Sequence, residues 1–307
     1  MYNFATEQKS FEVKGVRFGG QPGENPTALF GTVFYGKAYA TLDEVRKKEV
    51  RNLIHSQHSL GGMTGNPGVA DVFIAGPEQV EDRLSLVADA HHGPVSIDVP
   101  EAKTRIAALK YCRDAGLSSR LIYNSLNLGV TPEELVALKE SPPEVAICLG
   151  YNPRDFSTDG RVAILETGAG VLERGLISLA ADCGIKHVLL DTAATPFDHN
   201  ACESLRAIPV FKHKFGLPTG CAIHNTVESW LWMKQHRKEH ADAYDVCDAG
   251  SNLMPILLGA SFVVYGPMRN AHLVFPAAAM ADKLVAEGGE DYFAVKPSDG
   301  HPRRRLK

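Results

Sequence analysis

Short apolar runs alternate along this chain with longer stretches in which apolar residues recur every three or four positions. The short runs are typical of buried β-strands, and the three-to-four spacing is typical of amphipathic α-helices. We predict eight strands, at residues 29–35, 69–73, 95–98, 121–124, 145–149, 187–191, 219–223 and 262–265. Helices are predicted between them, including residues 43–58, 77–90, 101–115, 132–139 and 271–286.

The order of these elements predicts the fold. Eight strands, each followed by a helix, favour a single (β/α)8 TIM barrel over a doubly wound open sheet. Residues 11–18 alternate apolar and polar around Lys14-Gly15, which predicts a short N-terminal hairpin. Thr131, followed by Pro132 and two glutamates, has the composition of a helix start. No linker or shift in composition divides the chain, so we expect one domain over residues 1–307.

Several of the apolar strands end in a side chain that can form hydrogen bonds. The third, fourth, sixth and seventh predicted strands run into Asp98, Asn124, Asp191 and Asn225. Any one of them could simply cap a helix or a turn. In a parallel barrel, however, the carboxyl ends of the strands meet at one mouth, where active sites lie. Four together therefore predict a binding site, with two neighbours as further candidates: Asn127 and His224.

The chemistry of these side chains suits a pterin. A carboxylate accepts two parallel donors from the pyrimidine edge of a pterin, and an amide matches an edge of mixed donors and acceptors. We expect these acids and amides to lie together without a buried Lys or Arg, which suits a neutral polar heterocycle better than a phosphate. His224 is either part of this site or a hydrogen-bonded residue at its rim.

Composition excludes several other classes of protein. A net charge of −4 encodes no general attraction to nucleic acid or to an anionic membrane. The six cysteines lie at least 19 residues apart, which excludes a C-x-x-C pair and indicates reduced thiols. The longest apolar stretch, residues 253–265, is too short to span a bilayer. We therefore expect a cytoplasmic protein without membrane insertion, whose basic end, residues 303–305, is a frayed tail.

Longer motifs resemble a known family. They are residues 19–27, 31–35, 64–67, 122–125, 191–193, 216–218, 223–225, 246–248, 265–267 and 275–277. Together they cover nearly the whole chain and resemble the H subunit of tetrahydromethanopterin S-methyltransferase. Shorter bacterial relatives of that family are methylcorrinoid-protein:tetrahydrofolate methyltransferases of quaternary-amine demethylation, such as that of glycine betaine. The wider group of pterin-binding methyltransferases resembles dihydropteroate synthase in fold.

The resemblance implies a reaction and a site. It implies transfer of a methyl group between cobalamin on a corrinoid-binding partner protein and nitrogen-5 of a reduced pterin. When the methyl group moves to the pterin, cob(I)alamin leaves and the nitrogen loses a proton. Asp98, Asn124 and Asp191 match the family positions that hold the pterin, and Asn225 matches the catalytic position near nitrogen-5. A homodimer is also expected.

Which reduced pterin serves as the substrate is a separate question. The region between Tyr35 and Asn52 looks shorter than in the archaeal subunit, which favours tetrahydrofolate as substrate, in the bacterial manner. The alternatives are an activity on tetrahydromethanopterin, like that of the archaeal enzyme, and a non-catalytic pterin-binding subunit.

Other signals predict less. The glycine-rich residues 19–23 lack the Lys-Ser/Thr of a P-loop, and the twelve histidines lack the spacing of ligands, so no bound metal is predicted. A dihydropteroate synthase activity would need a buried cation for the diphosphate. Lys212 is expected near the mouth but is not part of a strand-end motif, which disfavours that activity. Ser125 and Cys221 lack an orienting base.

Two further sets of residues could belong to the site or have a structural role. Asp248 and Asn252 are interpreted as helix caps. Four aromatic side chains near strand ends either face the corrinoid or pack at the rim: Phe34, Tyr35, Tyr151 and Tyr265.

Overall fold

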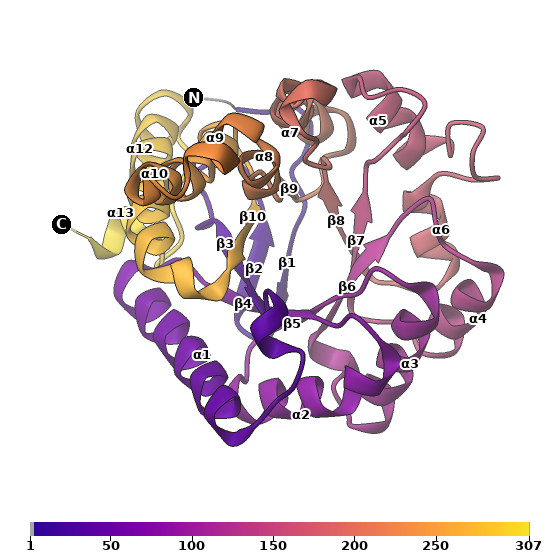
Figure 1. Ribbon diagram of the computed structural model, residues 1–307. Coiled ribbons are helices and arrows are strands. Elements are labelled where there is room, and N and C mark those ends of the chain that lie inside the picture. The colour runs from indigo at the N-terminus through magenta and orange to yellow at the C-terminus, as the bar shows by residue number, and fades with distance from the viewer. Residues whose placement is uncertain (1–2, 307) are drawn as a thin grey trace.

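The computed structural model describes residues 3–306 and contains a closed barrel of eight parallel strands (Figure 1), which confirms the predicted (β/α)8 fold. Around the barrel the order is β10-β3-β4-β5-β6-β7-β8-β9. The strands are β3 (Ala28–Val33), β4 (Gly68–Phe73), β5 (Val95–Asp98), β6 (Leu121–Leu126), β7 (Val145–Leu149), β8 (His187–Asp191), β9 (Thr219–Cys221) and β10 (Phe262–Pro267).

Helices surround the barrel and largely follow the predicted periodicity. They are α1 (Glu44–Thr64), α2 (Val80–Ala90), α3 (Ala102–Asp114), α4 (Pro132–Glu140), α5 (Thr158–Glu166), α6 (Leu176–Asp182), α7 (Cys202–Phe215), α8 (His224–Ser229), α9 (Leu231–His236), α10 (Ala241–Ser251), α11 (Leu253–Leu257), α12 (Ala271–Phe293) and α13 (Pro302–Arg305). Four short helices, α8 to α11, stand between β9 and β10, where none of the predicted helix ranges lies. The predicted seventh strand is correspondingly too long, because the chain turns into α8 at His224.

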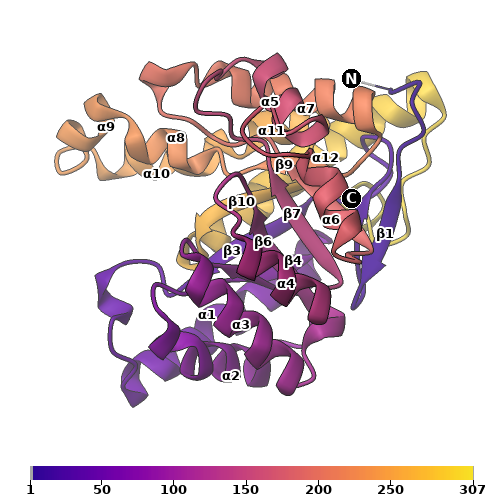
Figure 2. The same ribbon diagram turned by 90° about the vertical axis from the view of Figure 1, so that its right-hand side faces the viewer.

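The predicted hairpin is present and seals the amino-terminal end of the barrel. Its strands are β1 (Ser10–Val13) and β2 (Val16–Gly19), which pair antiparallel. Val13, Val16 and Phe18 join one apolar cluster with barrel side chains such as Phe30 and Leu189. Figure 2 shows this hairpin on the side opposite α8, α9 and α10. The barrel is therefore closed at one end and open only toward the carboxyl ends of its strands.

Strand alternation divides each barrel strand between two environments. Successive side chains point to opposite faces of a strand, so in β4 Val69 belongs to the apolar cluster inside the barrel, whereas Ala70 and Val72 pack among the surrounding helices. Asp71 and Phe73 share the inward parity of Val69. The inside of the barrel is thus apolar near the hairpin and becomes polar toward the mouth.

The helix start at Thr131 is confirmed and leads to a buried ion pair. The Thr131 side chain accepts a hydrogen bond from the backbone N–H of Glu134, and the Glu134 carboxylate accepts two from Arg105, at 2.9 and 2.8 Å. Tyr123 donates a further hydrogen bond to Glu134. Both charged side chains are almost fully buried, so this pair ties α4 to α3 and to β6.

Two predictions about cations are wrong. Residues 303–305 belong to α13 and are not frayed, because Arg303 pairs with Glu287 and Glu290 of α12 at 3.2 and 2.9 Å. Lys212 is not near the mouth: its ammonium donates to the carbonyl oxygen of Gly20 and to Ser261, which precede β3 and β10 at the amino-terminal end of the barrel. Within residues 3–306, no helix has the combination of length and apolar character that would let it cross a membrane.

We predict that Glu134→Ala lowers the free energy of unfolding by about 3–5 kcal/mol, because it leaves the buried Arg105 guanidinium without its counter-charge. Glu133→Ala is the matched control: this neighbouring glutamate is exposed and its loss is expected to change stability by under about 0.5 kcal/mol. Urea unfolding of both variants measures the difference. Equal stabilities would contradict a structural role for the pair.

Candidate functional site

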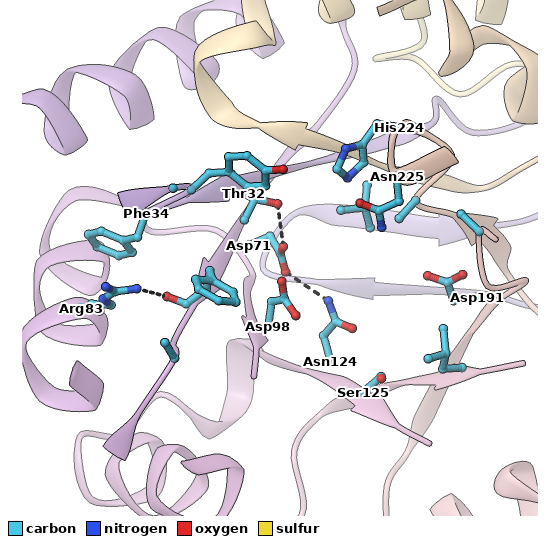
Figure 3. Close-up of a pocket in the computed structure, with 18 of the residues that line it drawn as sticks. Thr32, Phe34, Asp71, Arg83, Asp98, Asn124, Ser125, Asp191, His224 and Asn225 are labelled. Atoms are coloured by element: carbon cyan, nitrogen blue, oxygen red, sulfur yellow. Dashed lines mark hydrogen bonds between the residues drawn. The ribbon is translucent and has the colours of Figure 1, made fainter. Parts of the chain in front are cut away.

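A cavity of about 770 Å³ opens at the carboxyl ends of the barrel strands (Figure 3). This volume lies within the range typical of sites for small organic ligands. Its polar lining comes from separate strands: Thr32 from β3, Asp71 from β4, Asp98 from β5, Asn124 from β6 and Asp191 from β8. The register of the barrel sets Phe73 of β4 beside Asp98, and Asp98 beside Asn124, so the carboxyl and amide groups fall at the same depth.

Asp71 is the most buried of these carboxyl groups, with no exposed surface. Its Oδ1 accepts hydrogen bonds from Ser96 at 2.6 Å and from Asn124 at 3.3 Å, and its Oδ2 accepts one from Thr32 at 3.0 Å. Burial raises the pKa of Asp71, whereas the three donors lower it. Because donors satisfy both of its oxygens, Asp71 is the ionised member of the pair of neighbouring acids that it forms with Asp98.

Asp98 lies beside Asp71 in a contrasting environment. Among residues 3–306, none donates a hydrogen bond to its carboxyl group, and burial together with the neighbouring Asp71 charge raises the pKa of Asp98 well above its ordinary value. Two adjacent carboxyl groups out of water do not readily ionise together. Asp98 therefore retains the proton and can act as a donor toward the cavity.

Asp191, from β8, faces the cavity as the second acid predicted from the sequence. Its Oδ1 accepts a hydrogen bond from the backbone N–H of Ala193 at 2.7 Å. Burial raises the pKa of Asp191 to about 6, opposed by that hydrogen bond and by the Arg161 guanidinium. Asp191 is thus ionised near neutral pH, when it can accept hydrogen bonds, and becomes neutral below about pH 6.

Asn225 and His224 reach the mouth from the first turn of α8. Asn225 is exposed and lines the cavity, whereas His224 is 4% exposed. The Nδ1 atom of His224 has no hydrogen-bond partner within the described chain, and burial lowers the pKa of its ring to about 4, so the ring is neutral. Gly266 allows this placement, because a Cβ there would come within 2.6 Å of His224 Nδ1.

The remaining predicted residues are placed differently. Asn127 is outside the cavity lining: it donates to the carbonyl oxygen of Ser125 and accepts from the N–H of Gly129, which holds the turn after β6. The expectation that it contacts the ligand is therefore not supported. Tyr265 points out of the barrel and donates to Gln57 at 2.5 Å, so it does not face a partner at the mouth.

The other aromatic and capping interpretations have mixed outcomes. Phe34, Tyr35 and Tyr151 do line the cavity. Tyr35 donates a hydrogen bond to Glu228 of α8, which ties the end of β3 to the helices over the mouth. Asn252 caps α10 by donating to the carbonyl oxygen of Asp248, whereas Asp248 lies inside that helix and its carboxylate accepts from Asn270 at 2.9 Å.

The expectation that the site lacks buried cations is wrong. Arg83 lines the cavity, and Arg161 lies outside the lining but close enough to lower the pKa of Asp191; both are almost fully buried. Arg83 donates to the carbonyl oxygens of Phe73 and Tyr39 and lies over the ring of Phe34. Arg161 donates to the carbonyl oxygens of Thr192 and Ala193. Because backbone carbonyls occupy both guanidinium groups, they position loops rather than present a diphosphate site.

Sequence reasoning missed Asp71, the residue on which the site is built. A signal was present, since an acid stands between apolar neighbours within the predicted strand at residues 69–73 and not at its end. Such an acid almost never faces a core without partners. Its partners Thr32 and Ser96 come from other strands, so only the barrel reveals them. Within the described chain, no group of three or more His, Cys, Asp or Glu side chains is arranged to hold a metal ion.

Solved structures share this fold. The dihydropteroate synthase of Vibrio fischeri aligns with 91% of this chain and 98% of its own, with a TM-score of 0.62 and 14% identity. The enzyme of Xanthomonas albilineans, determined with 4-aminobenzoic acid, aligns with 91% and 98% at a TM-score of 0.59 and 12% identity. At these identities the likeness establishes the fold alone, and the class defined so far is a TIM barrel with an acid- and amide-lined mouth.

Sequence comparison identifies the family. Residues 6–296 match the family described as tetrahydromethanopterin S-methyltransferase MtrH subunit. The H subunit of this enzyme from Methanothermobacter thermautotrophicus is 40% identical over 310 residues, covering 100% of both chains. The H subunit of the putative methyltransferase mtx of Methanosarcina acetivorans is 37% identical over 306 residues, covering 98% of each. The chain belongs to the MtrH family.

The relatives also correct one inference. The subunits from Methanothermobacter thermautotrophicus and Methanocaldococcus jannaschii, 40% and 36% identical to this chain, are both named for tetrahydromethanopterin. These names favour the tetrahydromethanopterin alternative over the expected tetrahydrofolate.

We predict that Asp71→Asn lowers the pKa of Asp98. The substitution removes the neighbouring negative charge but keeps one of the two oxygens, which can accept from Ser96 or from Thr32, while burial still holds the Asp98 pKa above its ordinary value. Carbon-13 NMR of labelled aspartate carboxyl groups follows the titration. Asp191→Asn is the control and should leave the Asp98 midpoint in place. An unchanged Asp98 midpoint in Asp71→Asn would rule out coupling between the two acids.

Proposed function

We propose that this protein transfers a methyl group between nitrogen-5 of a reduced pterin and a corrinoid carried by a partner protein, with tetrahydromethanopterin as the pterin. The observation that carries this proposal is one cavity at the barrel mouth, lined by Asp98, Asn124 and Asp191, in a chain of the MtrH family. A partially reduced pterin presents both donors and acceptors, so a site for it needs both an acceptor and a donor.

The two acids divide this task. Asp191 is ionised above about pH 6, and its carboxylate can accept the ring N–H and exocyclic amino group of the pyrimidine edge. Asp98 holds a proton and can donate it to a ring nitrogen. Asn124 is fixed by its hydrogen bond to Asp71, which leaves its side-chain carbonyl for a further donor of the ligand. This arrangement supports a pterin lying across the barrel axis.

Asn225 supports the transfer step in this proposal. Loss of a methyl group from the pterin leaves an amine that needs a proton, so hydrogen bonding at nitrogen-5 assists departure. Asn225 can donate a hydrogen bond but cannot titrate. The proton then comes from a titratable group, and Asp98, with its raised pKa, is the candidate in the cavity. Asn225 positions and polarises the nitrogen while the barrel orients the ring.

An exposed apolar patch, formed by Phe197, Trp230, Leu231 and Trp232 and called the ledge below, favours a partner protein that binds over the mouth. Phe197, Leu231 and Trp232 are 51%, 62% and 48% exposed, and Trp230 contacts the rings of both Phe197 and Trp232. The segments that carry the ledge follow β8 and α8, and both of these elements contribute residues to the cavity. Exposed apolar patches of this kind are typical of protein interaction sites. A corrinoid protein bound there would cover the open end of the cavity.

Anaerobic methyl transfer tests the proposal. The purified chain with methylcobalamin and tetrahydromethanopterin should convert methylcob(III)alamin to cob(I)alamin, followed by absorbance, with tetrahydrofolate as the parallel substrate. Isothermal titration with both pterins establishes binding independently. Turnover with tetrahydrofolate alone would overturn the choice of pterin. Tight binding without turnover, even with a corrinoid protein present, would support a non-catalytic subunit.

We predict that Asn225→Ala and Asp191→Ala separate chemistry from binding. Asp191→Ala leaves two pterin donors unpaired, which costs about 2–4 kcal/mol, or roughly 30- to 1000-fold in Kd. Asn225→Ala should change Kd little and lower kcat about a hundredfold, more for methyl leaving the pterin than for methyl arriving. Single-turnover kinetics in both directions beside isothermal titration make the measurement. If Asn225→Ala weakens binding in step with the rate, its assigned role fails.

A further inference from the structure

A second cavity, of about 500 Å³, lies at the opposite end of the barrel from the proposed pterin site. Its walls are the turn between β1 and β2, the last turns of α1, the start of β4, the loop between α2 and β5, and the C-terminal segment that contains α13. Figure 2 shows the hairpin and the C-terminus together on this side, away from α8, α9 and α10. The methyl-transfer proposal makes no use of this cavity.

The ionisable side chains of the lining are all basic. Lys14, His58, His92 and Arg305 line the cavity, each from a different segment, and no carboxylate of the described chain does. His91 also lines it, but its ring is engaged with the carbonyl oxygen of Pro94. Within the described chain, none of the other four side chains has a hydrogen bond or an ion pair. This contrasts with Arg303 in the same short helix, which Glu287 and Glu290 neutralise. Unpaired basic groups from four segments converge here although the whole chain carries −4.

Glycines form much of the remaining wall. Gly61, Gly62, Gly65, Gly68, Gly93 and Gly300 all line the cavity. A Cβ on Gly62 or Gly300 would meet no atom within 4 Å, so open space lies in front of both. Gly61 and Gly62 lie within α1, and the N–H of Gly65 caps that helix at the carbonyl oxygen of Gly61. These glycines therefore give a ligand room, and the basic side chains supply the recognition.

We propose that this cavity binds a small, multiply charged anion of the phosphate class, such as a phosphorylated metabolite. Several converging basic groups favour more than one negative charge, and the volume holds a ligand larger than a single phosphate ion. Arg305 and Lys14 act as the principal cations at the rim, because both lie on segments anchored by other contacts: Lys14 in the β1–β2 turn, and Arg305 in a helix whose Arg303 is ion-paired to α12.

Isothermal titration of the full chain with inorganic pyrophosphate tests this site without any methyl-transfer assay. Binding is expected at low ionic strength and should weaken as salt is raised, because partly exposed charges are screened. Lys14→Gln combined with Arg305→Gln should weaken pyrophosphate binding roughly tenfold or more, as expected for loss of charge-assisted hydrogen bonds. Lys110→Gln, which removes an exposed lysine of α3 outside the lining, should leave binding unchanged.

A second variant keeps the test informative if the charge variants fold poorly. Gly62→Leu places a helix-favouring side chain into the open space in front of α1 and should abolish binding while the thermal midpoint is maintained. Asp191→Ala should bind pyrophosphate like the natural protein, which separates this site from the mouth. No binding at millimolar pyrophosphate, binding insensitive to all three cavity substitutions, or preferential binding of an acidic hexaglutamate peptide would overturn the proposal.

Discussion

The site depends on one buried charge, the Asp71 carboxylate. It accepts hydrogen bonds from Thr32, Ser96 and Asn124, which belong to β3, β5 and β6. A buried ionised carboxylate is costly unless it is fully satisfied, so these strands are constrained to the register that brings the three donors inward. Burial, together with the same charge, raises the pKa of Asp98. One group thus organises the polar layer of the barrel and determines where its proton resides.

The closed amino-terminal end complements this polar layer. The β1–β2 hairpin packs Val13, Val16 and Phe18 against the interior residues of the barrel, which excludes solvent from beneath the acids. A site open on one side only keeps its carboxyl groups in a medium of low polarity, where their pKa values rise and their interactions with ligand strengthen. The hairpin turn also contributes Lys14 to the cavity outside the barrel, so the seal separates an acidic pocket from a basic one.

The opposed protonation of Asp191 and Asp98 arises from their neighbours and not from their residue type. Asp191 has a backbone donor and the Arg161 guanidinium nearby, both of which favour its charged form. Asp98 has a like charge beside it and no donor among the described residues. The same side chain therefore serves as acceptor at one wall and as proton carrier at the other, which is how enzymes obtain acid and base from two carboxyl groups.

Apolar runs, helix periodicity and the Thr131 cap are local properties, and they are sufficient to predict the eight strands, the hairpin, the barrel and five of its helices, α1 to α4 and α12. The residues at strand ends were also readable, so Asp98, Asn124, Asp191, His224 and Asn225 were correctly expected to line one mouth. It is harder to predict which side chains of a strand point into the barrel and which point outward. Fully buried strands carry apolar side chains on both faces, so the sequence does not show which residues point inward, and both Asp71 and Tyr265 were misjudged.

Tertiary structure alone decided the contacts between distant segments. Lys212 could not be placed from the sequence, because its partners Gly20 and Ser261 are 192 and 49 residues away. Whether residues 303–305 form a helix likewise depends on the ion pairs of Arg303 with Glu287 and Glu290. Asn127 lies outside the site because its side chain is hydrogen-bonded within the turn after β6. Local pattern determines which elements form, whereas hydrogen bonding and charge between elements determine which side chains remain free to bind.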